Sequence, residues 1–142
     1  MDIDGLKSVV DEKCTEHLDR IWSMYNAPFA RFMGIEPVMI GPEETVCRME
    51  LRDEFYNSMD RGHGAAIYAL IDHTFAFATN IVRDCTGIET NVSYLRPAKG
   101  TLTAKATPIN RSRSFEHYSV EVRDESDNLI ASATCISYVI SR

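Results

Sequence analysis

One apolar segment constrains the fold of this chain more than any other feature. It runs from Ala65 to Ala78 (AAIYALIDHTFAFA) and contains one carboxylate, that of Asp72. A helix that is apolar on every side is normally buried. The segment therefore predicts a long central helix, from about residue 64 to residue 82, that the rest of the chain covers.

Segments with β-type patterns flank this helix. They are rich in Val, Ile, Thr and Tyr or alternate in polarity, and turn residues separate them. The six segments are residues 35–40, 45–51, 88–95, 101–109, 115–123 and 129–140. Short connections among the last four favour an antiparallel meander. One antiparallel sheet with one buried helix is an α+β layer architecture.

The N-terminal region has a different pattern. Apolar residues at helical spacing predict an amphipathic helix over residues 3–25. The whole chain of 142 residues has the usual size of one domain. We therefore expect a single domain, residues 1–142, in which residues 1–32 form an N-terminal helical extension.

The composition argues against several classes of protein. With 44% apolar residues and a net charge of −6, the chain is typical of a globular protein and unlike a general nucleic-acid binder. Four widely spaced cysteines without a CxxC pair argue against a zinc site or a disulfide framework. The acidic N-terminus lacks signal-peptide features, and Asp72 and His73 interrupt the longest apolar run. We expect a cytoplasmic protein with no nucleic-acid partner, no membrane span and no metal.

The carboxylate of Asp72 needs an explanation, because burying an unpaired charge costs on the order of several kcal/mol. A catalytic role is the first explanation. The alternative is a structural carboxylate that is paired across a subunit interface or caps a neighbouring loop.

The chain enters the central helix through the sequence Arg61-Gly62-His63-Gly64. Two glycines at a helix start let a ligand approach closely and leave backbone N–H groups free, where the helix dipole favours negative charge. A thioester or ester oxygen that gains charge in a transition state suits this place. The alternative is that the glycines only make a tight turn.

Gly64 and Asp72 lie too far apart on one helix to act together within one chain. Eight residues span about 12 Å along a helix, whereas a reacting atom has to lie about 3 Å from both groups. If both act on one substrate, a two-fold dimer must bring the helix start of one subunit beside Asp72 of the other.

The other polar residues indicate no second type of chemistry. His63 and His73 fall on different helix faces and form no metal pair, and we expect His63 to orient the loop. Ser58, Ser112 and Ser114 lie in polar turns without a nucleophile-elbow pattern, which argues against a serine hydrolase. Four basic residues fall in or beside strand connections, where they are either solvated turn charges or phosphate ligands. They are Arg96, Lys99, Arg111 and Arg113.

The pattern of Asn57, Gly62-His63-Gly64-Ala65 and Asp72, followed by residues 91–97 (NVSYLRP), resembles the PaaI-like family of hotdog-fold acyl-CoA thioesterases. The likeness covers about residues 33–140. Members of that family typically carry N-x5-H-G-G before the central helix and an acidic residue eight positions after the first glycine of that pair. Asn57 to His63, and Gly64 to Asp72, have these spacings.

The resemblance implies a hotdog fold, in which an antiparallel sheet wraps around one central helix, and a homodimer that is often assembled into a dimer of dimers. It also implies catalytic roles. The Gly64 amide polarises the thioester carbonyl, and Asp72 of the partner subunit acts as general base or nucleophile. Asn57 helps to place water or substrate, and His63 belongs to the catalytic loop.

The resemblance implies an acyl-CoA substrate and no separate cofactor, because coenzyme A enters only as part of the substrate. We expect its phosphates to be held at the basic turns.

Two positions depart from the family pattern. Ala65 replaces the second glycine, beside the acyl group, and Gly87 falls near where some relatives carry an assisting Ser or Thr. The neighbouring Thr86 also carries a hydroxyl, but we do not assign it this role. These departures keep a second interpretation open, a non-catalytic hotdog module that binds or senses acyl-CoA. A hotdog dehydratase or hydratase is a third interpretation, but its catalytic histidine pattern does not match this chain well.

Overall fold

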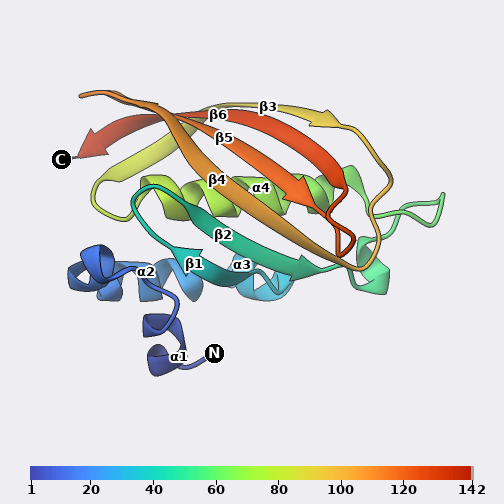
Figure 1. Cartoon of the computed structure of the whole chain (residues 1–142), viewed down its shortest axis with the longest axis horizontal. Coiled ribbons are helices and arrows are strands. Elements are labelled where there is room, and N and C mark those ends of the chain that lie inside the picture. The colour runs from blue at the N-terminus through green and yellow to red at the C-terminus, as the bar shows by residue number, and fades with distance from the viewer. Residues whose placement is uncertain (142) are drawn as a thin grey trace.

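A six-stranded antiparallel sheet curls around one long helix (Figure 1). The computed structural model describes residues 1–141. The strands are β1 (Glu36–Ile40), β2 (Thr45–Glu50), β3 (Asp84–Tyr94), β4 (Thr101–Arg111), β5 (Phe115–Arg123) and β6 (Leu129–Ser141). The helices are α1 (Ile3–Lys7), α2 (Leu18–Tyr25), α3 (Pro28–Met33) and α4 (Gly64–Thr79), with 3-10 segments η1 (Glu12–His17) and η2 (Asp53–Phe55). This architecture confirms the predicted α+β fold with a central helix.

Polar side chains define both ends of α4. At its start the imidazole Nδ1 of His63 accepts a hydrogen bond of 3.1 Å from the Ala65 N–H. At its end the side-chain oxygen of Asn80 accepts a hydrogen bond of 2.8 Å from the Cys85 N–H, which turns the chain into β3. The helix therefore ends at Thr79, earlier than the predicted residue 82.

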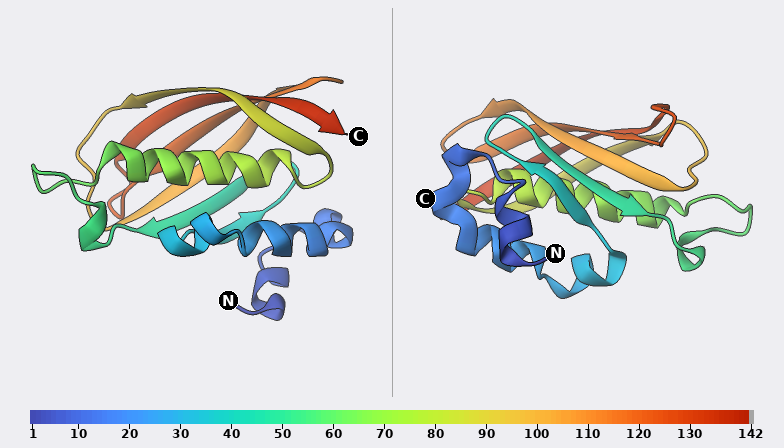
Figure 2. Two further views of the ribbon diagram at one scale, coloured as in Figure 1. Left: turned by 180° about the vertical axis from the view of Figure 1, so that it is seen from behind. Right: turned by 60° about the horizontal axis from the view of Figure 1, so that its bottom comes forward.

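Most of α4 is buried between the sheet and the N-terminal helices (Figure 2). Leu70, Ile71 and Phe77 are fully buried, and each side chain of this size contributes about 1.5–3 kcal/mol by leaving water. Opposite the helix the sheet presents several small buried residues, which let it approach α4 closely. They are Ala104, Ala106, Ala131 and Ala133. The core thus holds α4, and with it Gly64 and Asp72, in a fixed place.

The order of the strands differs from the predicted meander at one strand. β4, β5 and β6 do follow one another as antiparallel neighbours, but β3 pairs with β6, and β4 pairs with β2. The connection of residues 95–100 explains the difference, because it crosses the end of the sheet. It is held there by hydrogen bonds from the Leu95 N–H to the Ile130 carbonyl (2.8 Å) and from the Gly62 N–H to the Ala98 carbonyl (2.7 Å). β3 is consequently an edge strand.

Residues 3–25 form α1 and then, after a break, η1 followed directly by α2, so the prediction of one continuous helix over this range was wrong. After α1 the chain pairs with β1. The Ile40 N–H donates to the Val9 carbonyl (2.9 Å), and the Asp11 N–H donates to the Ile40 carbonyl (2.8 Å). The Asp11 carboxylate then caps η1 by accepting from the Lys13 N–H. A capping aspartate directly after two β-branched residues favours such a break.

The described residues also bear on membrane and metal binding. Within residues 1–141 no helix combines the length and the apolarity that crossing a membrane requires. In the same part of the chain, no group of three His, Cys, Asp or Glu side chains is placed to hold a metal ion. The four cysteines are free thiols.

Candidate active site

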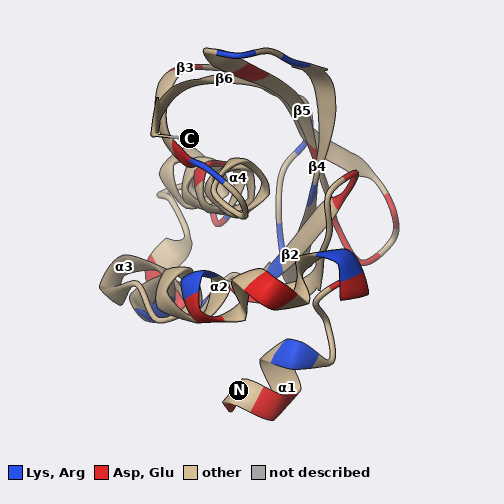
Figure 3. Ribbon diagram, turned by 90° about the vertical axis from the view of Figure 1, so that its left-hand side faces the viewer, with Lys and Arg blue, Asp and Glu red and all other residues tan. Residues whose placement is uncertain are grey.

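One side of α4 is left uncovered by the rest of the chain. Ala65, Tyr68 and Asp72 are exposed along it at helical spacing. Figure 3 looks along α4 and shows the sheet curling over it and α2 and α3 beneath it, while one side of the helix stays open. The prediction of a helix buried on every side is therefore wrong for this strip, which we call the open side of α4.

Asp72 lies on the open side of α4. Its side chain is exposed in the single chain, but the protein atoms around the carboxyl displace part of its water, and this desolvation raises its pKa above the usual range. A carboxylate with a raised pKa accepts a proton more readily, which suits a general base.

Thr90 on β3 carries a hydroxyl group and pairs with Cys135 of β6. The buried Cys135 thiol has a pKa raised to about 11, chiefly by burial; a hydrogen bond with Thr90 lowers it and the Asp72 charge raises it. Thr90 and the charge of Asp72 thus both influence this thiol. The hydroxyl of Thr86, to which no role was assigned from the sequence, is exposed on the outer face of β3.

A bulge explains why the sequence pattern missed Thr90. Gly87 pairs with Ser137, but Glu89 pairs with Ile136, so the register shifts between Gly87 and Glu89. Strict alternation from Gly87 places Thr90 on the outer face. The extra residue reverses the alternation and turns Thr90 towards α4.

Gly62 is a structural glycine. A Cβ atom at this position would lie 2.6 Å from Leu51 Cδ1 and 3.3 Å from the Ala98 carbonyl oxygen. Its N–H donates to the same carbonyl at 2.7 Å. Gly62 therefore permits the close approach of the loop to the connection of residues 95–100, as the tight-turn alternative requires.

Gly64 has free space and a free N–H. A Cβ atom there would meet the Tyr94 ring only at 3.5 Å, an ordinary contact distance. The His63 carbonyl accepts the Ala66 and Ile67 N–H groups, and the His63 Nδ1 accepts the Ala65 N–H. Among residues 1–141 the Gly64 N–H has no such acceptor. It is thus a free donor at the positive end of the α4 dipole.

A pocket of about 310 Å³ adjoins this free donor. It is lined by Gly64, Asn57 and Tyr94, together with Arg96 and Pro97 of the connection after β3. The loop and the turn that resemble the family motifs are therefore brought to one place by the fold.

Asn57 shapes the loop that borders this pocket. Its side-chain oxygen accepts hydrogen bonds from the Met59 N–H (2.9 Å) and the Arg61 N–H (3.2 Å). The side-chain amide nitrogen remains available for a ligand, because these two bonds use only the oxygen.

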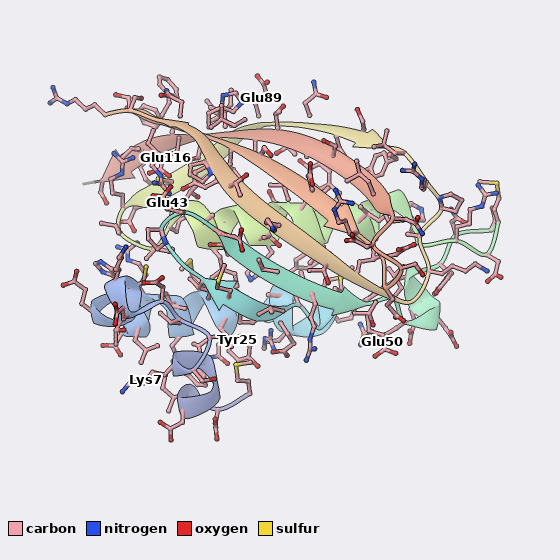
Figure 4. The ribbon with its side chains drawn as sticks, in the orientation of Figure 1. Lys7, Tyr25, Glu43, Glu50, Glu89 and Glu116 are labelled. Carbon is pink, nitrogen blue, oxygen red and sulfur yellow. The ribbon has the colours of Figure 1, made fainter. Side chains whose placement is uncertain are left out.

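The four basic residues fall into two groups at opposite ends of α4. Arg96 lines the Gly64 pocket and donates to the Leu129 carbonyl, and Lys99 pairs with Asp60 nearby. Arg111 lies at the other end, where it hydrogen-bonds the Tyr118 hydroxyl and pairs with Glu43. Figure 4 shows Glu43 and Glu116 at that end of the molecule. The exposed Arg113 is in the neighbouring β4–β5 turn.

His73 lies apart from the Gly64 pocket. Its ring packs edge-on against Phe77, with 4.7 Å between the ring centroids, and its Nε2 is buried without a hydrogen-bond partner among residues 1–141. Burial, assisted by the charge of Arg31, lowers its pKa from 6.5 to about 4. A neutral imidazole packed in this way has a structural role.

Residues 62–131, from Gly62 into β6, match the family described as the thioesterase superfamily. The chain belongs to this superfamily. Its PaaI-like character is supported by the acyl-coenzyme A thioesterase PaaI of Escherichia coli, which is 26% identical over 118 residues, covering 77% of this chain and 81% of that protein.

Solved structures agree with this assignment. A mutant of the phenylacetic acid degradation protein PaaI from Thermus thermophilus is 29% identical, with a TM-score of 0.77 over 80% of this chain and 100% of that chain. The E. coli PaaI structure gives a TM-score of 0.84 over 91% of this chain and 94% of that chain at 22% identity, and shows the shared fold. The chain is a PaaI-like hotdog protein and a thioester hydrolase.

Proposed function

We propose that this thioesterase hydrolyses an acyl-CoA or aryl-CoA, with the Gly64 amide and Asp72 as its central groups. The free Gly64 N–H beside an open pocket is the observation that carries the proposal, because hydrolysis of a thioester needs a donor for the developing oxyanion. The name of the E. coli relative, an acyl-coenzyme A thioesterase, supports coenzyme A as the thiol part of the substrate.

We infer that the active unit is a homodimer formed along β3 and the open side of α4. β3 is an edge strand of 11 residues, and a long exposed edge favours pairing with another strand. Ile88 on this strand and Tyr68 on α4 are exposed large side chains that a second copy would cover. Antiparallel pairing of β3 with its copy reverses one subunit relative to the other, and so brings Asp72 towards the partner's helix start.

A further apolar patch supports a dimer of dimers. Phe115 and Tyr138 lie in contact on the outer face of the sheet, and Ile140 is also exposed there. Exposed apolar side chains gathered on a sheet face are typical of protein–protein interfaces.

In the proposed reaction, water attacks the thioester carbonyl carbon while Asp72 of the partner subunit takes a proton from it. The carbonyl oxygen gains negative charge and is held by the Gly64 N–H. The carbon–sulfur bond then breaks, and the coenzyme A sulfur leaves with the proton from Asp72. Direct attack by the Asp72 carboxylate, followed by hydrolysis of the anhydride, uses the same groups.

The remaining site residues receive supporting roles. Asn57 presents its side-chain amide nitrogen to water or substrate, and His63 holds the first turn of α4. Arg96 and Lys99 attract the coenzyme A phosphates at their own subunit's pocket. Arg111 and Arg113 do so at the partner's pocket, because the reversed subunit brings the far end of α4 there.

We assign the acyl group of the substrate to a second, apolar pocket beside the start of α4. This pocket, of about 350 Å³, is lined by Phe29 and Phe32 of α3, Phe55, and Ala65 on the first turn of α4. Ala65 is the residue that replaces the second glycine of the family pattern, so its methyl group limits the acyl groups that fit.

A panel of acyl-CoA and aryl-CoA thioesters, assayed by release of the free thiol, tests the proposed function. Turnover that depends on Asp72 supports a thioesterase. Tight binding of coenzyme A without turnover of any thioester would instead indicate the binding or sensing module.

A further inference from the structure

We propose that Tyr94 is a positioning residue that fixes the direction of the Gly64 N–H, the donor to the oxyanion. The proposal rests on the proposed function, because it assigns Tyr94 a part in the same reaction. Tyr94 acts through the peptide group between Gly64 and Ala65 and not on the substrate carbonyl.

The contact between Tyr94 and Gly64 is direct. The Tyr94 hydroxyl donates a hydrogen bond of 3.2 Å to the Gly64 carbonyl oxygen. A carbonyl oxygen has two lone pairs, so this bond adds to the one that the helix makes. The Tyr94 side chain also lies beside the glycine, since a Cβ atom there would lie 3.5–3.7 Å from the Tyr94 Cζ, Cε1 and hydroxyl oxygen.

The same peptide group is held from its other side. The Ala65 N–H donates to the His63 Nδ1 at 3.1 Å. The backbone of His63, the residue before Gly64, is also held in place, because the His63 N–H donates a hydrogen bond of 2.7 Å to the Phe55 carbonyl. Gly64 therefore has a fixed backbone both before and after it.

A glycine needs such support more than other residues do. The site requires Gly64 because a bare backbone lets a ligand approach, but glycine has the widest choice of backbone conformations. Oxyanion stabilisation depends on a donor that already points at the place where charge develops. The Gly64 N–H belongs to the preceding peptide group, between His63 and Gly64. Hydrogen bonds on both sides of the Gly64–Ala65 peptide restrict rotation about the backbone of Gly64, and so hold the two peptide groups in a fixed relation.

The hydroxyl remains a donor under working conditions. Burial, with a smaller effect from the neighbouring Tyr68, raises the pKa of Tyr94 above its usual range, so the hydroxyl keeps its proton at neutral pH. Tyr94 is also the last residue of β3, opposite Ala131 of β6. It therefore links the end of the edge strand to the helix start.

The test substitutes Tyr94→Phe, which removes the hydroxyl and keeps the ring. With the thioester that the wild type hydrolyses best, we expect kcat to fall about three- to tenfold, the effect of one net hydrogen bond. KM and the Kd for coenzyme A should stay within about twofold, because the ring wall of the pocket remains. Tyr138→Phe, an equal change at an exposed tyrosine on the outer sheet face, is the control and should leave kcat unchanged.

A second measurement does not depend on activity. Hydrogen exchange of a peptide covering residues 62–67 should be faster in Tyr94→Phe than in the wild type, and unchanged in Tyr138→Phe. His63→Ala combined with Tyr94→Phe should lower kcat by less than the product of the two single effects, because both side chains hold one peptide group.

The outcomes separate this proposal from the proposed function. If the wild type hydrolyses no thioester, the proposed function fails, whatever the exchange rates show. If the wild type is active and Tyr94→Phe keeps its kcat, or changes KM alone, Tyr94 is not a positioning residue. Unchanged hydrogen exchange at residues 62–67 also overturns the proposal.

Discussion

The substitution Gly64→Ala tests the catalytic role proposed for Gly64 and distinguishes this glycine from the structural Gly62. At Gly64 the added methyl group meets the Tyr94 ring at 3.5 Å, so it fits without displacing the backbone. Alanine is also the better helix former, and the change in stability should be a gain of at most about 1 kcal/mol. At Gly62 the same methyl group lies 2.6 Å from Leu51 Cδ1 and 3.2 Å from the Ala98 Cβ. Gly62→Ala should therefore destabilise the protein by about 1–3 kcal/mol.

Gly64→Ala, which should not destabilise the protein, is expected to lose catalytic activity. Gly64 lines the pocket, so the methyl group of Gly64→Ala enters it beside the Tyr94 ring. In the proposed reaction this added group crowds the thioester carbonyl that the Gly64 N–H binds. A displacement of the carbonyl by about 1 Å lowers the rate by on the order of 10²-fold. We expect kcat/KM to fall by about that factor while the midpoint of thermal unfolding stays equal or rises.

Thermal unfolding and thiol release on the same preparations check both parts. Gly64→Ala with wild-type kcat/KM would refute the assignment of its N–H, since the methyl group would then lie away from the substrate. Gly64→Ala that unfolds more easily than the wild type would refute the geometry on which the prediction depends.

Three further predictions concern charge. Asp72→Asn should lower kcat by on the order of 10²-fold in the thiol-release assay. Because desolvation raises the pKa of Asp72, ionisation of this carboxyl destabilises the folded protein. Asp72→Asn should therefore also raise the midpoint of thermal unfolding at neutral pH, but not below about pH 3.9, where the carboxyl is protonated in the folded and the unfolded chain. An equal difference in the midpoint at all pH values would contradict this. The low pKa of His73, about 4 against 6.5, means that the unfolded chain takes up a proton first as the pH falls. Stability should therefore decrease from pH 6.5 towards pH 4, and denaturant titrations of His73→Leu should show a smaller decrease. Arg96→Ala with Lys99→Ala should raise KM for acyl-CoA far more than for a short thioester without the nucleotide; equal changes would remove these residues from phosphate binding.

The elements with a strong local signal could be predicted from the sequence. The apolar run of residues 65–78 predicted α4, and alternation predicted all six strands within a few residues of their observed bounds. The His-Gly motif and its spacing to Asp72 are local too, so the resemblance to the family could be drawn from them.

The features that were missed depend on long-range contacts. Whether β3 pairs with β4 or β6 is decided by the connection of residues 95–100, which is held by the loop at Gly62. The N-terminal helix is broken because the chain pairs with Ile40 of β1. The position of Thr90 follows from a bulge, and the contact of Tyr94 with Gly64 joins two elements 30 residues apart. No pattern within one segment contains this information.

Mixed dimers test most directly the central claim that each active site takes Gly64 from one subunit and Asp72 from the other. Gly64→Ala and Asp72→Ala, each expected to keep only about a hundredth of the wild-type activity or less, are unfolded together and refolded as an equal mixture. Two different affinity tags, purified in succession, first establish that mixed dimers have formed.

A mixed dimer holds one site with both defects and one site with neither. Random pairing should therefore restore about a quarter of the wild-type rate of thiol release. If each subunit carried a complete site of its own, every site in the mixture would keep one defect. Mixed dimers as inactive as their parents would contradict the shared active site and the role that it gives to Asp72.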